Sequence, residues 1–121
     1  MSEYFAVPGG NRPFSEAVKA GNTLYVSGTV GIDRETKTFP KDFSEQARLA
    51  IENLKNTLEK HGYSLDDLVK VVVLITEIEH AADFNEIYVK AFKDHLPART
   101  LTGIKLVGDA KVELDAIAYK D

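Results

Sequence analysis

The segment Val69–Thr76, which reads VKVVVLIT, constrains the fold more than any other part of the chain. β-Branched residues dominate it, and because they lose side-chain freedom in a helix but pack well on a pleated sheet, the segment predicts a strand. Side chains of a strand point alternately to the two faces of its sheet. The predicted strand therefore has two apolar faces, one formed by Val69, Val71, Val73 and Ile75 and the other by Val72 and Leu74. Such a strand requires a sheet that is covered on both faces.

Four more segments read as strands and two as helices. The strands are Ser15–Ala20, Thr23–Gly28, Arg99–Lys105 and Lys111–Lys120, and the helices are Phe43–Lys60 and Ala81–Lys93. The first two strands are joined by a tight turn at Gly21 and Asn22. No linker or repeat interrupts the series. We therefore expect one domain, residues 1–121, of the α+β class with the order β-β-α-β-α-β-β.

The first helix is the best marked element. Asp42 can cap its start with Glu45 reaching back in a capping box, and Gly62 lies just past its end. Its apolar residues recur at three- and four-residue spacing and form one stripe: Ala47, Ala50, Ile51, Leu54 and Leu58. This stripe is expected to pack on the sheet.

The last predicted strand also has two distinct faces. Val112, Leu114, Ala116 and Ala118 point one way, and Glu113, Asp115, Ile117 and Tyr119 point the other. The first set suits a core under the helices. Because two helices can cover only one face of the sheet, we infer that another copy of the chain covers the other face in a closed symmetric ring. A curled sheet with one solvated face is the alternative.

Composition excludes several classes of protein. No segment is apolar over the roughly 20 residues that a membrane span needs. Cysteine is absent, which excludes disulfides and thiolate chemistry and suits a reducing compartment. The opening residues lack the pattern of a secretory signal, so we expect a cytoplasmic protein. A net charge of −4 without a run of basic residues makes nucleic acid an unlikely partner.

Arg99 is the first candidate functional residue, because it follows Pro97 and Ala98 in an uncharged run with no acidic neighbour. A guanidinium binds a carboxylate through two parallel hydrogen bonds, so Arg99 with Glu113 could hold a small anion and move a proton on it. A structural ion pair between these two strands remains the alternative. The three histidines lack metal-ligand spacing, and we expect no metal site.

The chain resembles the Rid family of imine and enamine deaminases, also called the YjgF family. The resemblance is collinear from Pro13 to Ala118 and rests on these stretches: RPFSEAVKAGNTLYVSG, EQARLAIENLKNTLEKHG, SLDDLVKVVVLIT, FNEIY, PAR and VELDAIA. It implies a chorismate-mutase-like fold, with two helices on one face of a mixed sheet. It also implies a homotrimer with a site in each cleft between subunits.

The resemblance implies a reaction without a cofactor. Water attacks the C=N bond of a 2-imino acid, formed from an enamine such as 2-aminoacrylate or 2-aminocrotonate, and a 2-keto acid and ammonia are released. In the family the arginine of PAR, here Arg99, binds the substrate carboxylate. The glutamate of the last strand, here Glu113, positions the attacking water or shuttles its proton.

Further positions carry over from the same resemblance. Asn85 matches an asparagine that lines the family's cleft, Ser27 and Gly28 match the hairpin end that borders it, and the backbone of Leu101 lies where main-chain groups meet the ligand. Phe14 stands where many members have a substrate-facing tyrosine. Thr29 stands where the family usually has glutamine, and Leu101 where it often has cysteine. These departures bear on the size of the substrate and on the rate.

Two function classes beside a general deaminase remain. A deaminase specialised for one pathway enamine would use the same cleft, and a regulatory module would bind 2-keto acids there without turnover. Some relatives are described as ribonucleases or translation inhibitors, and the acidic charge balance argues against that activity here.

Overall fold

The computed structural model describes all residues, 1–121, and contains one sheet of six strands. The strands are β1 Glu3–Ala6, β2 Ser15–Ala20, β3 Thr23–Val30, β4 Leu68–Ile75, β5 Ala98–Gly103 and β6 Val112–Tyr119. Their order across the sheet is β1-β2-β3-β6-β4-β5. Only β4 and β5 are parallel, so the sheet is mixed and the fold is α+β, as predicted.

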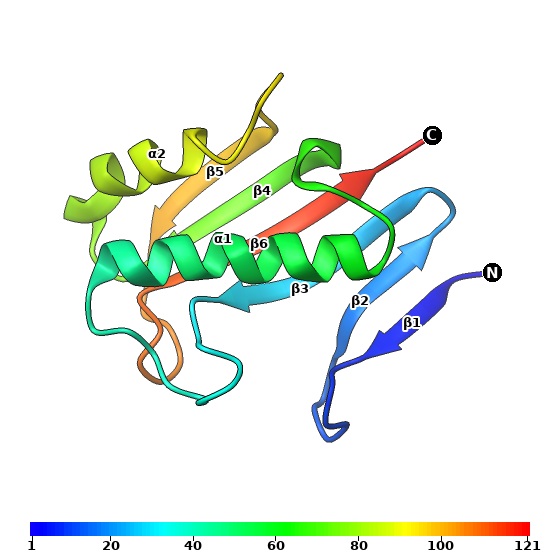
Figure 1. Cartoon of the computed structure of the whole chain (residues 1–121), viewed down its shortest axis with the longest axis horizontal. Coiled ribbons are helices and arrows are strands. Elements are labelled where there is room, and N and C mark those ends of the chain that lie inside the picture. Colours follow the sequence, from blue (N-terminus) through cyan, green and yellow to red (C-terminus); the bar gives the residue numbers. More distant parts are fainter.

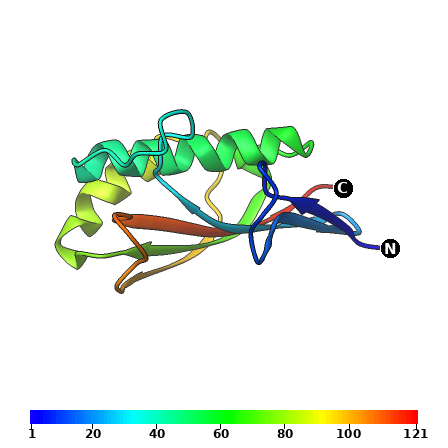
Figure 2. The same cartoon turned by 90° about the horizontal axis from the view of Figure 1, so that it is seen from below.

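Both helices lie on one face of this sheet (Figure 2). Helix α1, Phe43–Lys60, crosses β6 and β3, and α2, Ala81–Val89, lies beside β4 and β5 (Figure 1). Short 3₁₀ turns, Leu65–Asp67 and Ile78–His80, precede β4 and α2. The helix stripe and the predicted inner face of β6 meet in one buried core, since Val112, Leu114, Ala116 and Ala118 are all almost completely buried.

Helix α1 has the predicted bounds, and of the predicted capping box only the bond made by Asp42 is found. The Asp42 carboxylate accepts a hydrogen bond of 3.0 Å from the Glu45 backbone N–H, which satisfies one of the free donors of the first turn. Gly62 follows the last turn with φ 86°, a conformation that glycine adopts without steric penalty.

One strand is missing from the prediction, and the ends of several predicted elements are wrong. Strand β1 was not predicted, and it adds an antiparallel edge beside β2. Helix α2 ends at Val89 rather than Lys93, because the chain tightens: the Ala91 N–H donates to Tyr88 and the Phe92 N–H to Val89. Strand β3 continues to Val30, past the predicted end at Gly28.

Val69 does not share the buried face of β4. In the pairing of β4 with β6, Leu68 lies opposite Ala118 and Lys70 opposite Ile117, so Val69 is an extra residue at a bulge. The bulge shifts the alternation by one, and Leu68 is buried while Val69 is 47% exposed. From Val71 onward the predicted faces are correct.

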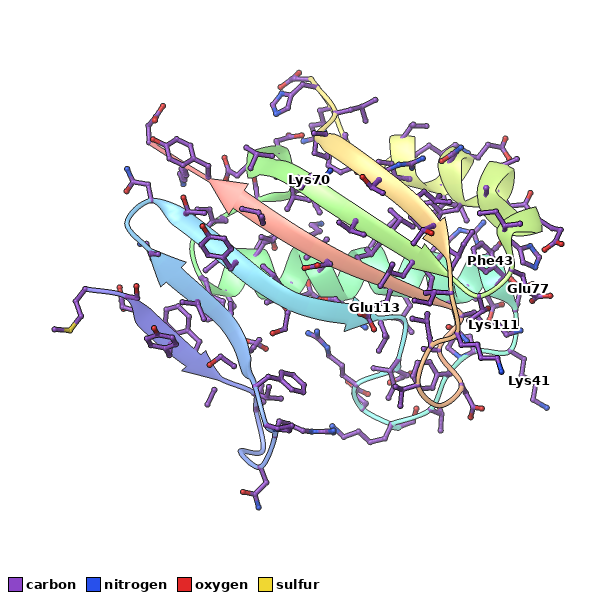
Figure 3. All side chains as sticks on the ribbon, turned by 180° about the vertical axis from the view of Figure 1, so that it is seen from behind. Lys41, Phe43, Lys70, Glu77, Lys111 and Glu113 are labelled. Atoms are coloured by element: carbon purple, nitrogen blue, oxygen red, sulfur yellow. The ribbon has the colours of Figure 1, made fainter.

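The face of the sheet away from the helices is uncovered in one chain. A row of side chains crosses it through the paired positions Tyr4, Val18, Tyr25 and Ile117. Tyr25 is 48% exposed and Tyr119 is 45% exposed, while Ile117, Val72 and Leu74 are half-buried. We call this surface the open face; Figure 3 views it directly, with Lys70 and Glu113 labelled.

Candidate functional site

The predicted site residues fall into two groups in the structure. Ser27, Gly28 and Glu113 come from the adjacent strands β3 and β6. Arg99 and Leu101 come from β5, and Asn85 comes from α2 beside it. In the sheet order β4 separates β5 from β6. Neighbouring strands lie about 4.8 Å apart, so the backbones of β5 and β6 are roughly 10 Å from each other.

Glu113 lies on the open face with its carboxylate against Gly28 (Figure 3). Two residues of β3, Ser27 and Gly28, bulge out between Val26 and Thr29, where the pairing with β6 shifts register. A β-carbon at position 28 would lie only 2.7 Å from Cδ of Glu113. The absence of a side chain at Gly28 therefore gives the Glu113 carboxylate the space that it occupies.

The surroundings of Glu113 disfavour its charged form. Partial burial raises the pKa of its carboxyl, and the neighbouring carboxylate of Asp115 raises the pKa further. A carboxyl group with a raised pKa is better able to accept and return a proton near neutral pH than an ordinary glutamate.

Phe14, Ser27 and Gly28 line a cleft of about 360 Å³; Glu113 does not line it and adjoins it through its contact with Gly28. The Phe14 side chain is 52% exposed. The Ser27 hydroxyl donates a hydrogen bond to the Ser15 carbonyl, which links β3 to β2 beside the cleft. The structure thus brings these three predicted residues together, with Glu113 at the same end of β3.

Arg99 lies on the helix-covered face. It pairs with the fully buried Val71 on β4, and its guanidinium carbon is 5.0 Å from the centre of the Tyr88 ring and 5.9 Å from that of Phe84. A guanidinium over aromatic rings is attracted by their negative faces. The rings of Phe84 and Tyr88 on α2 therefore support the Arg99 guanidinium on the helix-covered side of the sheet. No protein carboxylate forms an ion pair with it.

Tyr88 is the residue that the sequence reasoning missed. It is 5% exposed, and its hydroxyl is buried without a hydrogen-bond partner. Burial raises the pKa of Tyr88 to about 12, although the nearby charge of Arg99 acts in the opposite direction. Its sequence position, four residues after Phe84 on an apolar helix side, predicts only a core residue. The contact with Arg99 becomes visible only when β5 and α2 are placed together.

The positions of Asn85 and Leu101 give weaker support for a role in the site. Asn85 is exposed on α2 next to Phe84. The Leu101 side chain packs against the core opposite Val73. Because β5 is an edge strand, its outer backbone has no partner strand within the chain and is available to a ligand.

Arg99 and Glu113 do not face one crevice within a single chain. Arg99 shares the helix-covered face with Val71, whereas Glu113 lies on the open face opposite Leu74. The ion pair between them is excluded by the same geometry. Within one chain these two candidate residues therefore belong to separate surfaces.

The structure contains no group of three or more histidine, aspartate or glutamate side chains arranged to hold a metal ion. None of its helices combines the length and the apolar character needed to cross a membrane.

The comparisons with known proteins agree with the fold. The model of the family described as endoribonuclease L-PSP matches residues 6–120. A RutC family protein of Pyrococcus horikoshii is 40% identical over 111 residues, which cover 90% of this chain and 88% of the relative. TdcF of Escherichia coli, named as a candidate reactive intermediate deaminase, is 33% identical over 117 residues, which cover 93% of this chain and 91% of TdcF.

Solved structures give the same result. RidA from an Antarctic Psychrobacter superimposes with a TM-score of 0.87 at 37% identity, covering 90% of this chain and 89% of RidA. Escherichia coli TdcF with bound serine superimposes with a TM-score of 0.89 at 32% identity, covering 95% of this chain and 94% of that chain.

Proposed function

The chain belongs to the endoribonuclease L-PSP family, which includes proteins named RutC, RidA and TdcF, and from this membership we propose that it hydrolyses 2-imino acids and their enamine tautomers. The products are a 2-keto acid and ammonia. The observation that carries the proposal is the Glu113 carboxylate, held against Gly28 beside the cleft with a raised pKa.

Glu113 acts on the water. In the proposed reaction the water oxygen bonds to the imine carbon of the substrate, and Glu113 accepts the proton that the water loses. Glu113 passes this proton to the nitrogen, which gives a carbinolamine. The proton of the new hydroxyl group then also moves to the nitrogen, the C–N bond breaks, and ammonia leaves as the carbonyl forms. This use of Glu113 requires its ionised form. The rate should therefore fall as the pH is lowered, with a midpoint above the ordinary glutamate pKa of 4.5.

Arg99 binds the substrate carboxylate. Its guanidinium is stacked over Tyr88 and lacks a protein carboxylate, which leaves its planar donors for a ligand. Leu101 offers backbone groups at the outer edge of β5, and Asn85 borders the same end of the sheet. Phe14, Ser27 and Gly28 line the opposite wall.

The two groups meet between subunits of a homotrimer. A second copy placed on the open face of the first would bury Tyr25, Ile117 and Tyr119 and bring β5 of one chain toward Glu113 of its neighbour. An exposed sheet face that carries both apolar and polar side chains is suited to such an interface. Each chain then contributes one domain, residues 1–121, in a cytoplasmic enzyme that needs neither metal nor cofactor.

A second candidate function is binding of 2-keto acids without turnover. It is favoured by Phe14, which has no hydroxyl to offer a reacting group. Specialisation for one pathway enamine is a variant of the first proposal. Ribonuclease activity, which the family description names, is disfavoured by the chain's net charge of −4.

The test is ammonia release from freshly generated 2-aminoacrylate. We expect the wild-type protein to accelerate it, and Arg99→Ala and Glu113→Gln each to lose about 100-fold or more in kcat/KM. Arg48→Ala is the matched control, because Arg48 is exposed on α1 and forms no ion pair. Full activity of Arg99→Ala would contradict the site. Binding of 2-oxobutanoate without ammonia release would favour the regulatory module.

A further inference from the structure

The cleft beside Gly28 exists because β2 and β3 separate. The two strands pair only from Ala17 to Ala20 against Thr23 to Val26. β2 nevertheless begins at Ser15 and β3 continues to Val30, so their far ends diverge. Residues of the loops on both sides and the end of α1, Thr57 and Lys60, line the space between them.

Positive charge is concentrated in this cleft. Four basic side chains line it, and Glu16 is the only acidic one: the basic residues are Arg12, Arg34, Lys37 and Lys60. The chain as a whole has a net charge of −4, so this balance is the reverse of the overall one. A cleft lined by one sign of charge attracts ligands of the opposite sign.

Glu16 does not neutralise the cleft. Its carboxylate is held by Lys60 at 2.8 Å and by His61 at 3.0 Å. The charges of Glu16 and Lys60 therefore cancel each other at the end of α1. Arg12, Arg34 and Lys37 form no ion pair and remain available to a ligand.

The loop that carries Arg34 and Lys37 is ordered by its own hydrogen bonds. The Asp33 side chain accepts from the backbone N–H groups of Glu35 and Thr36, and the Asp33 N–H donates to the Thr38 carbonyl. Arg34 is tethered as well, since its guanidinium donates to the hydroxyl of the buried Thr57 at 3.3 Å.

Lys37 has a backbone conformation that glycine would adopt more easily. Its φ is 62°, and it is the only residue other than glycine with a positive φ in the structure. Residues held in this region concentrate where the backbone conformation serves a site. The left-handed turn places Lys37 among the residues that line the cleft.

The cleft is also larger than a small imino acid needs. Its volume of about 360 Å³ lies within the range of roughly 300–1,000 Å³ that is typical of sites for whole small molecules. A three-carbon imino acid whose reactive carbon lies at Gly28, the lining residue that contacts Glu113, would leave most of this volume unfilled.

We propose that the basic end of this cleft binds a second anionic group of the substrate, so that the preferred substrate is a 2-imino acid with a carboxylate or phosphate at its far end. The inference rests on the proposed deaminase function, because Gly28 and Glu113 define the reactive end. Arg34 is the main ligand, since a guanidinium matches the two oxygens of either group, and Lys37 and Arg12 add charge.

The test measures binding of stable 2-oxo acids, the product analogues, by calorimetry. The probes are 2-oxobutanoate with one carboxylate, 2-oxoglutarate with two, and 3-phosphonooxypyruvate with a carboxylate and a phosphate. We expect the wild-type protein to bind at least one doubly anionic probe about tenfold more tightly than 2-oxobutanoate. The tighter of the two identifies the far group as carboxylate or phosphate.

The double variant Arg34→Gln/Lys37→Gln should lose this tenfold preference and keep its affinity for 2-oxobutanoate. Both side chains are exposed, so the fold should persist, which circular dichroism checks. Lys55→Gln, on the outer side of α1, is the matched control and should behave as wild type.

Equal affinity of the wild-type protein for all three probes would overturn the proposal, as would a preference that survives in the double variant. Tighter binding of a short single-stranded RNA that depends on Arg34 and Lys37 would assign the cleft to nucleic acid instead. Because the readout is binding, a protein that discriminates among the probes but releases no ammonia would refute the deaminase function alone.

Discussion

At the scale of single residues, Gly28 and Glu113 form one unit. The carboxylate of Glu113 fills the space that a β-carbon at position 28 would need. The obstructing atoms are the far end of a flexible side chain, and they can move aside. An added methyl group at position 28 should therefore displace the carboxylate rather than unfold the bulge.

We expect Gly28→Ala to lose about 100-fold in kcat, because a displacement of about 1 Å at a reacting group has effects of this size. The free energy of unfolding should fall by less than about 1 kcal/mol. Ammonia release and urea unfolding measure the two quantities. Gly103→Ala is the matched control, since its β-carbon would meet nothing nearer than 3.7 Å. A large loss of stability with full activity would show that Gly28 is structural only.

The sequence marks Arg99 and Glu113 as candidate site residues but contains too little information to place them. An uncharged neighbourhood marks Arg99 as unpaired, and the structure agrees that no protein acid pairs with it. Alternation along each strand cannot reveal that the two side chains lie on opposite faces, since that depends on the register of β4 with β5 and β6. Tyr88 is hidden for a similar reason, because its partner lies on another element.

At the scale of elements, Glu16 connects β2 to the end of α1. It accepts from Lys60 and from the mostly buried His61, whose ring stacks on Phe5 of β1 at 4.1 Å between centroids. This contact joins the edge strands to the helix at the basic cleft. Burial raises the pKa of Glu16, but hydrogen bonds from Lys60 and His61 outweigh burial and leave the pKa below its ordinary value of 4.5.

A lowered pKa in the folded state means that the ionised group stabilises the fold. This contribution is complete above pH 4.5, the ordinary value, and is lost as the pH falls through the lower folded value. We expect Glu16→Gln to reduce the free energy of unfolding by about 1 kcal/mol at pH 7, with the difference from wild type shrinking below pH 4.5.

Urea unfolding at a series of pH values measures this difference. Glu59→Gln serves as the control, because Glu59 is exposed on the same turn of α1 and forms no ion pair. A difference between Glu16→Gln and wild type that is constant from pH 7 to pH 3 would rule out the ionised carboxylate as its source.

Elements with local signals are readable from the sequence, and those without them are not. The Asp42 cap and the Gly62 stop fix α1 at its predicted bounds. Strand β1 is short and has no repeating pattern, so only its pairing with β2 identifies it. The bulge at Val69 likewise arises from the pairing of β4 with β6, and a run of valines contains no signal that predicts it.

At the scale of the whole molecule, the proposed site depends on the open face. One sheet face is covered by α1 and α2, and the other presents tyrosines and aliphatic side chains together with Glu113 (Figures 2 and 3). Arg99 and Glu113 lie on different faces and about two strands apart. An active site between copies resolves this separation, because it takes Arg99 from one chain and Glu113 from the next.

Such a site predicts complementation between two inactive variants. We expect Arg99→Ala and Glu113→Gln to be inactive alone and to regain activity when they are unfolded, mixed in equal amounts and refolded together. In a ring that assembles at random, about a quarter of the sites then receive an intact arginine from one chain and an intact glutamate from its neighbour. Ammonia release should therefore recover to about a quarter of the wild-type rate.

The control is the same mixture without the unfolding step, in which assembled copies do not exchange and activity should stay at the level of the separate variants. If refolded mixtures also stay inactive while each variant forms the same oligomer as wild type, both residues act within one chain, and Arg99 must then leave the aromatic rings of α2 to reach Glu113. Recovery near a quarter instead requires that every site is shared, which is the arrangement that the opposite placement of Arg99 and Glu113 favours.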